Sequence, residues 1–73
     1  MDITYVIKEK IATLQEKRDG WKKMLCLVSW NGAEPKLDLR EWSPDFKKMS
    51  RGITLSAEEM DVIVAAMNER GRA

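Results

Sequence analysis

Two short runs decide the fold of this chain: KLDLREW at residues 36–42 and RGITLS at residues 51–56. The first run alternates as a β-strand does, so neighbouring side chains point to opposite faces of a sheet. Leu37 and Leu39 share one face, which we predict to be the core. The other face, predicted to be exposed to solvent, carries Lys36, Asp38, Arg40 and Trp42. A tryptophan beside two cations on an exposed face favours contact with a stacked base and a phosphate.

The second run leads into a helix. Ser56 is a good N-cap, and Glu59 three residues later completes a capping box. The apolar residues that follow have the i, i+3, i+4, i+7 spacing of one helix face: Met60, Ile63, Val64 and Met67. Three more apolar residues widen this surface, so the helix needs cover on two sides. We expect its own sheet on one side and a second copy of the helix on the other, with Met60, Ile63, Val64 and Met67 in a dimer interface.

Two further strands are predicted before residue 36, at residues 7–17 and 21–30. Asp19-Gly20 separates them, and Asn31-Gly32 precedes the third strand; both dipeptides are typical of hairpin turns. Pro44 ends the third strand, and residues 51–55 form a short fourth one. The predicted fold class is therefore α+β, in the order β-β-β-β-α. It is a four-stranded antiparallel curved meander followed by one C-terminal helix.

The length and composition bound the function. A chain of 73 residues forms a single domain, 1–73, with an ordered core at about 7–70, and it is marginally stable alone. With one cysteine and no histidine, an internal disulfide and a zinc site of the usual ligands are not expected. Oligomerisation is thus the expected source of extra stability. We predict no metal, no cofactor and no enzymatic activity. The free thiol and the lack of a targeting or membrane-spanning segment indicate a cytoplasmic protein with no membrane partner.

These residues together resemble the transcriptional positive cofactor four family, whose members are small single-stranded-DNA-binding proteins. The resemblance covers about residues 7–70. It rests on the pattern hydrophobic-Asp-hydrophobic-Arg-Glu-aromatic, followed by Lys/Arg-Gly-Ile-Ser/Thr-Leu before a helix. The phrase VSWNG at residues 28–32 looks most like the compact bacterial branch. The resemblance implies a homodimer built through the helices, with curved sheets that form channels for single strands.

The resemblance also implies which residues contact nucleic acid. Arg40 matches the arginine of the Arg-Glu pair, Trp42 the aromatic residue after it, and Trp30 an aromatic at the end of the second strand. Asn31 stands where the eukaryotic pattern has a lysine. The full expected set is Lys22, Lys23, Trp30, Asn31, Lys36, Arg40, Trp42 and Arg51. Within it the tryptophans would stack on bases and the cations, Arg40 included, would neutralise phosphates.

Other interpretations stay open at this point. Trp30 lies beside a turn and could close a hairpin, while Lys22 and Lys23 could be a solvated hairpin end. The protein could instead be an interaction module of a transcription complex, using the helix face or the sheet edge. It could also bind RNA, since stacking and phosphate contacts do not distinguish RNA from DNA. The leading prediction is a homodimer that binds single-stranded DNA with little sequence preference, in transcription regulation, replication or repair. Its expected location is the cytoplasm, nucleoid included.

Overall fold

The computed structural model describes residues 3–71 as one antiparallel sheet followed by a helix. Its elements are β1 (Tyr5–Glu16), β2 (Lys22–Trp30), β3 (Lys36–Trp42), β4 (Ile53–Leu55) and α1 (Ala57–Arg70). Each strand pairs with the next, in the order β1-β2-β3-β4. The predicted α+β meander with one C-terminal helix is confirmed, although β1 begins at Tyr5 and β4 only at Ile53.

Both predicted hairpins form where their dipeptides lie. In the first, Gly20 has a φ of 90° and the Trp21 N–H donates to the Asp19 carboxylate at 3.0 Å. In the second, Asn31 and Gly32 have left-handed φ values of 52° and 75°, and the Ala33 N–H donates to the Trp30 carbonyl at 2.9 Å. This β-turn lies within a longer connection, because the last paired residues of the two strands are Val28 and Lys36.

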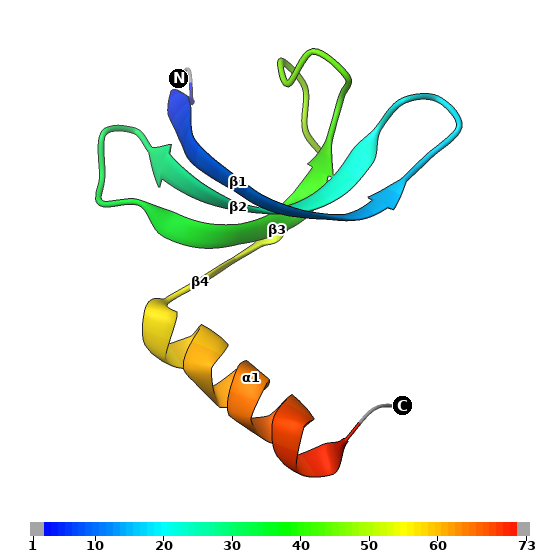
Figure 1. Ribbon diagram of the computed structural model, residues 1–73. Coiled ribbons are helices and arrows are strands. Elements are labelled where there is room, and N and C mark those ends of the chain that lie inside the picture. The colour runs from blue at the N-terminus through cyan, green and yellow to red at the C-terminus, as the bar shows by residue number, and fades with distance from the viewer. Residues whose placement is uncertain (1–2, 72–73) are drawn as a thin grey trace.

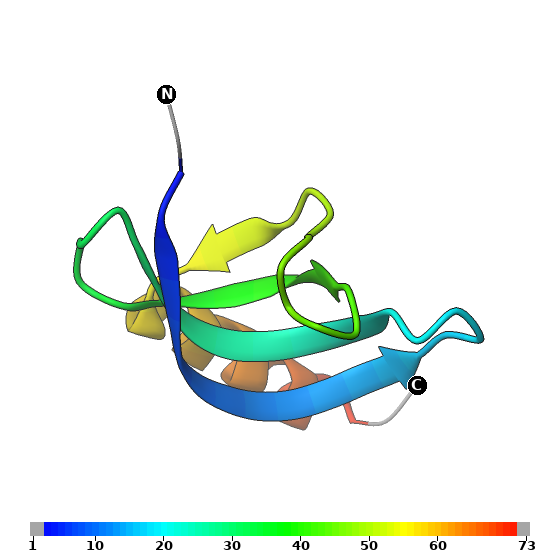
Figure 2. The same cartoon turned by 90° about the horizontal axis from the view of Figure 1, so that it is seen from above.

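The sheet is strongly curved, and the helix lies on its convex side (Figure 1; Figure 2 shows the same arrangement from above). Three irregularities in β1 interrupt its pairing with β2, between Ile7 and Glu9, between Lys10 and Ala12, and between Thr13 and Gln15. Such bulges bend a strand and increase its local twist. The bending brings the side chains of the concave face close together and spreads those of the convex face.

The core therefore lies on the concave face. Its buried hydrophobic residues are Met24, Cys26, Val28 and Trp42. The loop between β3 and β4 closes one end of this face, and there the Tyr5 hydroxyl donates a hydrogen bond to the Phe46 carbonyl. Burial, followed by the nearby Asp38 carboxylate, raises the pKa of the Cys26 thiol above its ordinary value.

The sequence prediction was right about which residues share a face and wrong about which face is buried. In the register of β2 on β3, Met24 is opposite Arg40 and Cys26 is opposite Asp38, so the even-numbered residues of β3 do lie together. That face is the concave one, however, and both Asp38 and Trp42 are fully buried in it. Leu37 and Leu39 lie half-buried on the convex face instead. Alternation separates two faces, but curvature decides which one closes on itself.

The helix begins at the predicted capping box. The Glu59 N–H donates to Ser56 Oγ at 3.1 Å, the Ser56 N–H donates to Glu59 Oε1 at 2.8 Å, and Gly71 follows the last turn. No residue of α1 is buried. The most exposed of its large apolar side chains are Val62, Ile63, Val64 and Met67, each between 43% and 68% exposed. Local capping and not packing against the sheet thus defines this element.

Candidate nucleic-acid interface

Three aromatic side chains surround Trp42 on the concave face. Its ring centroid lies 5.3 Å from that of Tyr5, 5.9 Å from Phe46 and 6.4 Å from Trp30. The Trp30 and Trp42 rings are nearly parallel, with 14° between their planes. Because Trp42 has no exposed surface, its predicted place on a solvent face is wrong. In this arrangement it packs against Trp30 and offers no plane to a base.

Arg40 is held between Trp30 and Asp38. Its Nε and Nη2 donate to the two oxygens of Asp38 at 2.6 and 2.7 Å, which is the bidentate geometry of a strong ion pair. The guanidinium carbon lies 4.5 Å from the Trp30 ring centroid, over the face of the ring. The third guanidinium nitrogen, Nη1, contacts the sulfur of Met49 at 3.5 Å. The side chain is thereby fixed on three sides.

Gly52 permits this arrangement. A side-chain carbon added at Gly52 would overlap the Leu39 carbonyl oxygen and the Arg40 side chain. The backbone of the loop can therefore pass directly beside Arg40 only because residue 52 is glycine. This close approach gives a physical reason for the Gly-Ile pair that the sequence analysis singled out.

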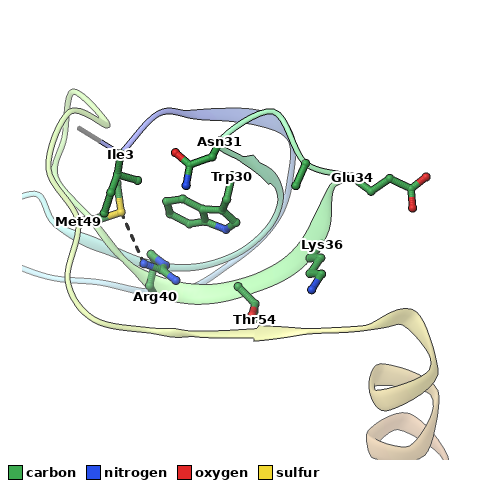
Figure 3. A pocket seen from close by; sticks show the side chains of 9 residues that line it. Ile3, Trp30, Asn31, Glu34, Lys36, Arg40, Met49 and Thr54 are labelled. Atoms are coloured by element: carbon green, nitrogen blue, oxygen red, sulfur yellow. Dashed lines mark hydrogen bonds between the residues drawn. The ribbon is translucent and has the colours of Figure 1, made fainter. Parts of the chain in front are cut away.

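A pocket of about 440 Å³ opens beside Trp30 and Arg40. Figure 3 shows Arg40 below the Trp30 ring, Asn31 above it and Lys36 to one side. The residues lining the pocket are Ile3, Trp30, Asn31, Ala33, Glu34, Lys36, Arg40, Met49 and Thr54. Four of the eight residues predicted to contact nucleic acid thus surround one space: Trp30, Asn31, Lys36 and Arg40.

The two polar atoms of the Asn31 side chain face different partners. Its Oδ1 accepts a hydrogen bond from the Thr4 N–H at 3.0 Å, and Thr4 Oγ1 lies 3.4 Å from the same atom. This contact ties the start of the chain to the second hairpin. The amide nitrogen is turned towards Trp30 and the pocket, where it is placed to donate to a ligand (Figure 3).

The predicted cations at the other end of the sheet do not join this pocket. Lys22 and Lys23 point to opposite faces, because they are neighbours in β2. Lys22 lies 3.9 Å from the Glu16 carboxylate. Lys23 and Arg51 instead line a second pocket of about 220 Å³, together with Leu14, Leu39, Arg40, Glu41 and Ser50. The eight predicted residues therefore fall into separate groups.

Some pocket residues were missed by the sequence analysis. Thr54 could have been predicted from strand alternation. It is paired with Asp38 and therefore lies on the same face of the sheet. Ile3 and Met49 lie outside the paired strands and carried no periodic signal. Lys10 was also missed: its ammonium lies 3.9 Å from the Phe46 ring centroid, at the edge of the aromatic cluster. The bulges of β1 break the alternation that would have placed it.

An ion pair also braces the β1–β2 hairpin against β3. Lys17 Nζ lies 3.0 Å from Glu41 Oε1, and this hydrogen bond, with the Glu41 charge, raises the pKa of the Lys17 ammonium. Glu41 is thus engaged with a neighbouring lysine.

Across residues 3–71 no group of three or more His, Cys, Asp or Glu side chains is placed to hold a metal ion. In the same part of the chain no helix is long and apolar enough to cross a membrane.

The chain is similar to a known protein family and to a bacterial protein. The sequence model of the family described as Transcriptional Coactivator p15 (PC4) matches residues 17–66, from the first hairpin into α1. A protein of Treponema pallidum (strain Nichols), described as uncharacterized, is 37% identical to this chain over 67 residues. The aligned part covers 92% of this chain and 79% of that protein. The family match includes both runs quoted at the start and every residue that lines the 440 Å³ pocket except Ile3.

Proposed function

Because this chain belongs to the Transcriptional Coactivator p15 (PC4) family, we propose that it binds single-stranded DNA as a homodimer, with little sequence preference. The family is a nucleic-acid-binding, non-enzymatic one, associated with single-stranded-DNA binding and transcription coactivation. The observation that carries the proposal for this chain is the concave pocket around Trp30, Asn31, Lys36 and Arg40.

The pocket offers what an unpaired nucleotide needs. Trp30 and Arg40 supply flat surfaces, and stacking on such a platform contributes about 1–3 kcal/mol per base. Lys36 is exposed at the pocket wall and is placed to neutralise a phosphate, while the Asn31 amide nitrogen can donate to a base. None of these groups reads a full base edge in the way that sequence-specific proteins do. Binding with little sequence preference follows from that chemistry.

The same geometry favours single strands over duplex. The platform lies on the inside of a curved sheet, where a base must be turned out of its strand to reach it. In duplex DNA the bases are stacked and paired inside the helix, so that reaching the pocket requires unpairing. A single strand has already exposed its bases and avoids this cost.

The homodimer is supported by the exposed apolar surface of the helix and the sheet. Ile63, Val64 and Met67 of the predicted stripe are 43%, 50% and 49% exposed, whereas Met60 is half-buried. Ile53 on the convex face is 57% exposed. A second copy that packs its own helix into this region would cover both surfaces, and small domains commonly gain stability in this way. The process that such a dimer serves would be transcription regulation, replication or repair.

A competition experiment tests the proposal. Labelled oligo(dT) should bind the protein, and duplex DNA of equal length should compete poorly. For single strands the slope of log K against log salt should be about −0.7 per phosphate neutralised. Equal competition by duplex, nucleotide for nucleotide, would show that the basic residues are only a general electrostatic surface. Tighter binding of oligo(U) than of oligo(dT) would favour an RNA-binding protein. Failure to bind any strand would favour an interaction module of a transcription complex.

A further inference from the structure

Arg40 lines the proposed binding pocket beside Trp30, and its charge is balanced by Asp38. Asp38 has no exposed surface and makes both of its hydrogen bonds to Arg40, at 2.6 and 2.7 Å. The Asp38–Arg40 pair as a whole therefore carries no net charge. Displacing the guanidinium towards a phosphate would leave the Asp38 carboxylate buried and alone, which is strongly unfavourable.

Arg40 is also unable to follow a flexible strand. Its side chain is only 14% exposed. Trp30 covers one face of the guanidinium, Met49 contacts Nη1, and the backbone at Gly52 leaves no space beside the side-chain stem. A residue that clamps phosphates has a mobile head group and an open approach. Lys36 is exposed on the same face of β3, so a phosphate can approach it from solvent.

What Arg40 does present is a fixed plane. The guanidinium is one wall of the 440 Å³ pocket, next to the Trp30 ring and across from Asn31 (Figure 3). Arginine planes stack on unpaired bases as aromatic rings do, and they stack on rings as well. A base that enters the pocket over Trp30 therefore meets the guanidinium, because Arg40 covers that face of the indole.

From these contacts we infer that Arg40 is a stacking and positioning residue. Its guanidinium, neutralised by Asp38 and laid on Trp30, is the plane on which a base rests. The phosphate contact beside it is made by Lys36. The inference rests on the proposed function and assigns different roles to two neighbouring cations of the same pocket.

The test is a salt titration of oligo(dT) binding with four proteins. They are the wild type, the charge-balanced double variant Asp38→Asn with Arg40→Gln, the single variant Arg40→Lys, and the control Lys36→Gln. The double variant removes the plane without leaving a lone buried charge, and Arg40→Lys keeps the charge but removes the plane. Circular dichroism confirms that each variant retains its sheet. Should one of the two Arg40 variants fail to fold, the other still decides the question.

The Arg40 variants and the Lys36 variant have different expected results. Both Arg40 variants should bind roughly 5- to 150-fold more weakly, the loss of about one stacked base, with an unchanged salt slope. Lys36→Gln should make the slope shallower by about 0.7, the value of one phosphate contact. A shallower slope in the double variant, or wild-type affinity in Arg40→Lys, would show that Arg40 is a phosphate clamp and overturn the inference. A wild type that does not bind oligo(dT) would instead overturn the proposed function.

Discussion

Trp42 is enclosed on the concave face by Tyr5, Phe46 and Trp30, whose ring centroids lie between 5.3 and 6.4 Å from its own. Removing the indole would leave a large cavity among residues that cannot collapse without losing their own contacts. Trp42→Ala should therefore lower the free energy of unfolding by about 3–5 kcal/mol, a large share of the stability of a domain this small. Urea unfolding followed by circular dichroism measures the loss.

The Trp42→Phe variant serves as the matched control, because it keeps an aromatic ring and should cost markedly less. An unchanged unfolding midpoint in Trp42→Ala, combined with weaker binding of oligo(dT), would contradict the buried position. It would return Trp42 to the exposed platform that its neighbours in the sequence suggest.

The residues of β3 show how far alternation could go. It correctly grouped Lys36, Asp38, Arg40 and Trp42, and the pairing with β2 confirms that grouping. It could not tell that Asp38 would be buried, because a carboxylate is buried only when a partner such as Arg40 satisfies it. The Asp38–Arg40 ion pair depends on the conformations of both side chains, which the spacing of residues in the sequence does not determine.

Among the elements, the loop between β3 and β4 is stabilised by hydrogen bonds to one carboxylate. Asp45 accepts from the Lys47 N–H at 3.0 Å and from the Ser43 hydroxyl at 2.7 Å. These bonds, the backbone one first, lower the pKa of Asp45 below its ordinary value of 3.8. The ionised carboxylate therefore stabilises the folded state at neutral pH. That contribution is lost as the pH falls below the ordinary pKa and through the lower folded one.

The Asp45→Asn variant tests this linkage. The wild type should lose thermal stability between about pH 5 and pH 2 more steeply than the variant does, because the variant has no carboxylate at this site to protonate. Above about pH 6, where the carboxylate is ionised, the wild type should be the more stable of the two proteins. Parallel curves for the two proteins across the whole range would show that ionisation of Asp45 contributes nothing to the stability.

The elements themselves were predictable where local chemistry defines them. Asp19-Gly20, Asn31-Gly32 and the Ser56–Glu59 capping box each satisfy a backbone requirement of their own turn or helix end, and all three form. The bulges of β1 were not predictable, because they arise from pairing with β2 and not from the β1 sequence. They produce the curvature that decides where the core lies.

For the molecule as a whole, the sequence predicted only part of the candidate site. Trp30, Asn31, Lys36 and Arg40 meet in one pocket because they lie on β2, β3 and the turn between them. Lys23 and Arg51 line a different pocket, on the other side of the sheet. A set chosen by charge and sequence position includes both groups, although alternation along β2 puts Lys23 on the face opposite to that of Trp30.

The exposed helix gives the last prediction, which concerns assembly. Sedimentation equilibrium at micromolar concentration should give about twice the chain mass of 8.4 kDa. Ile63 is 43% exposed in a single copy, so Ile63→Asp places a charge on a surface that water reaches in the monomer but that a dimer would bury. A penalty of about 3 kcal/mol weakens the dimer by roughly 100-fold, so the variant should dissociate at protein concentrations at which the wild type is still a dimer.

The control for that experiment is Asn68→Asp, which adds the same charge at an exposed polar position of α1 and should leave the dimer intact. If the dimer presents the concave pockets of both copies to one strand, Ile63→Asp should also weaken binding of long oligo(dT) more than binding of a short oligonucleotide that fills one pocket. A wild type that sediments as a monomer would contradict the dimer, whereas the pocket on the concave face would remain available for binding, because all the residues that line it come from one chain.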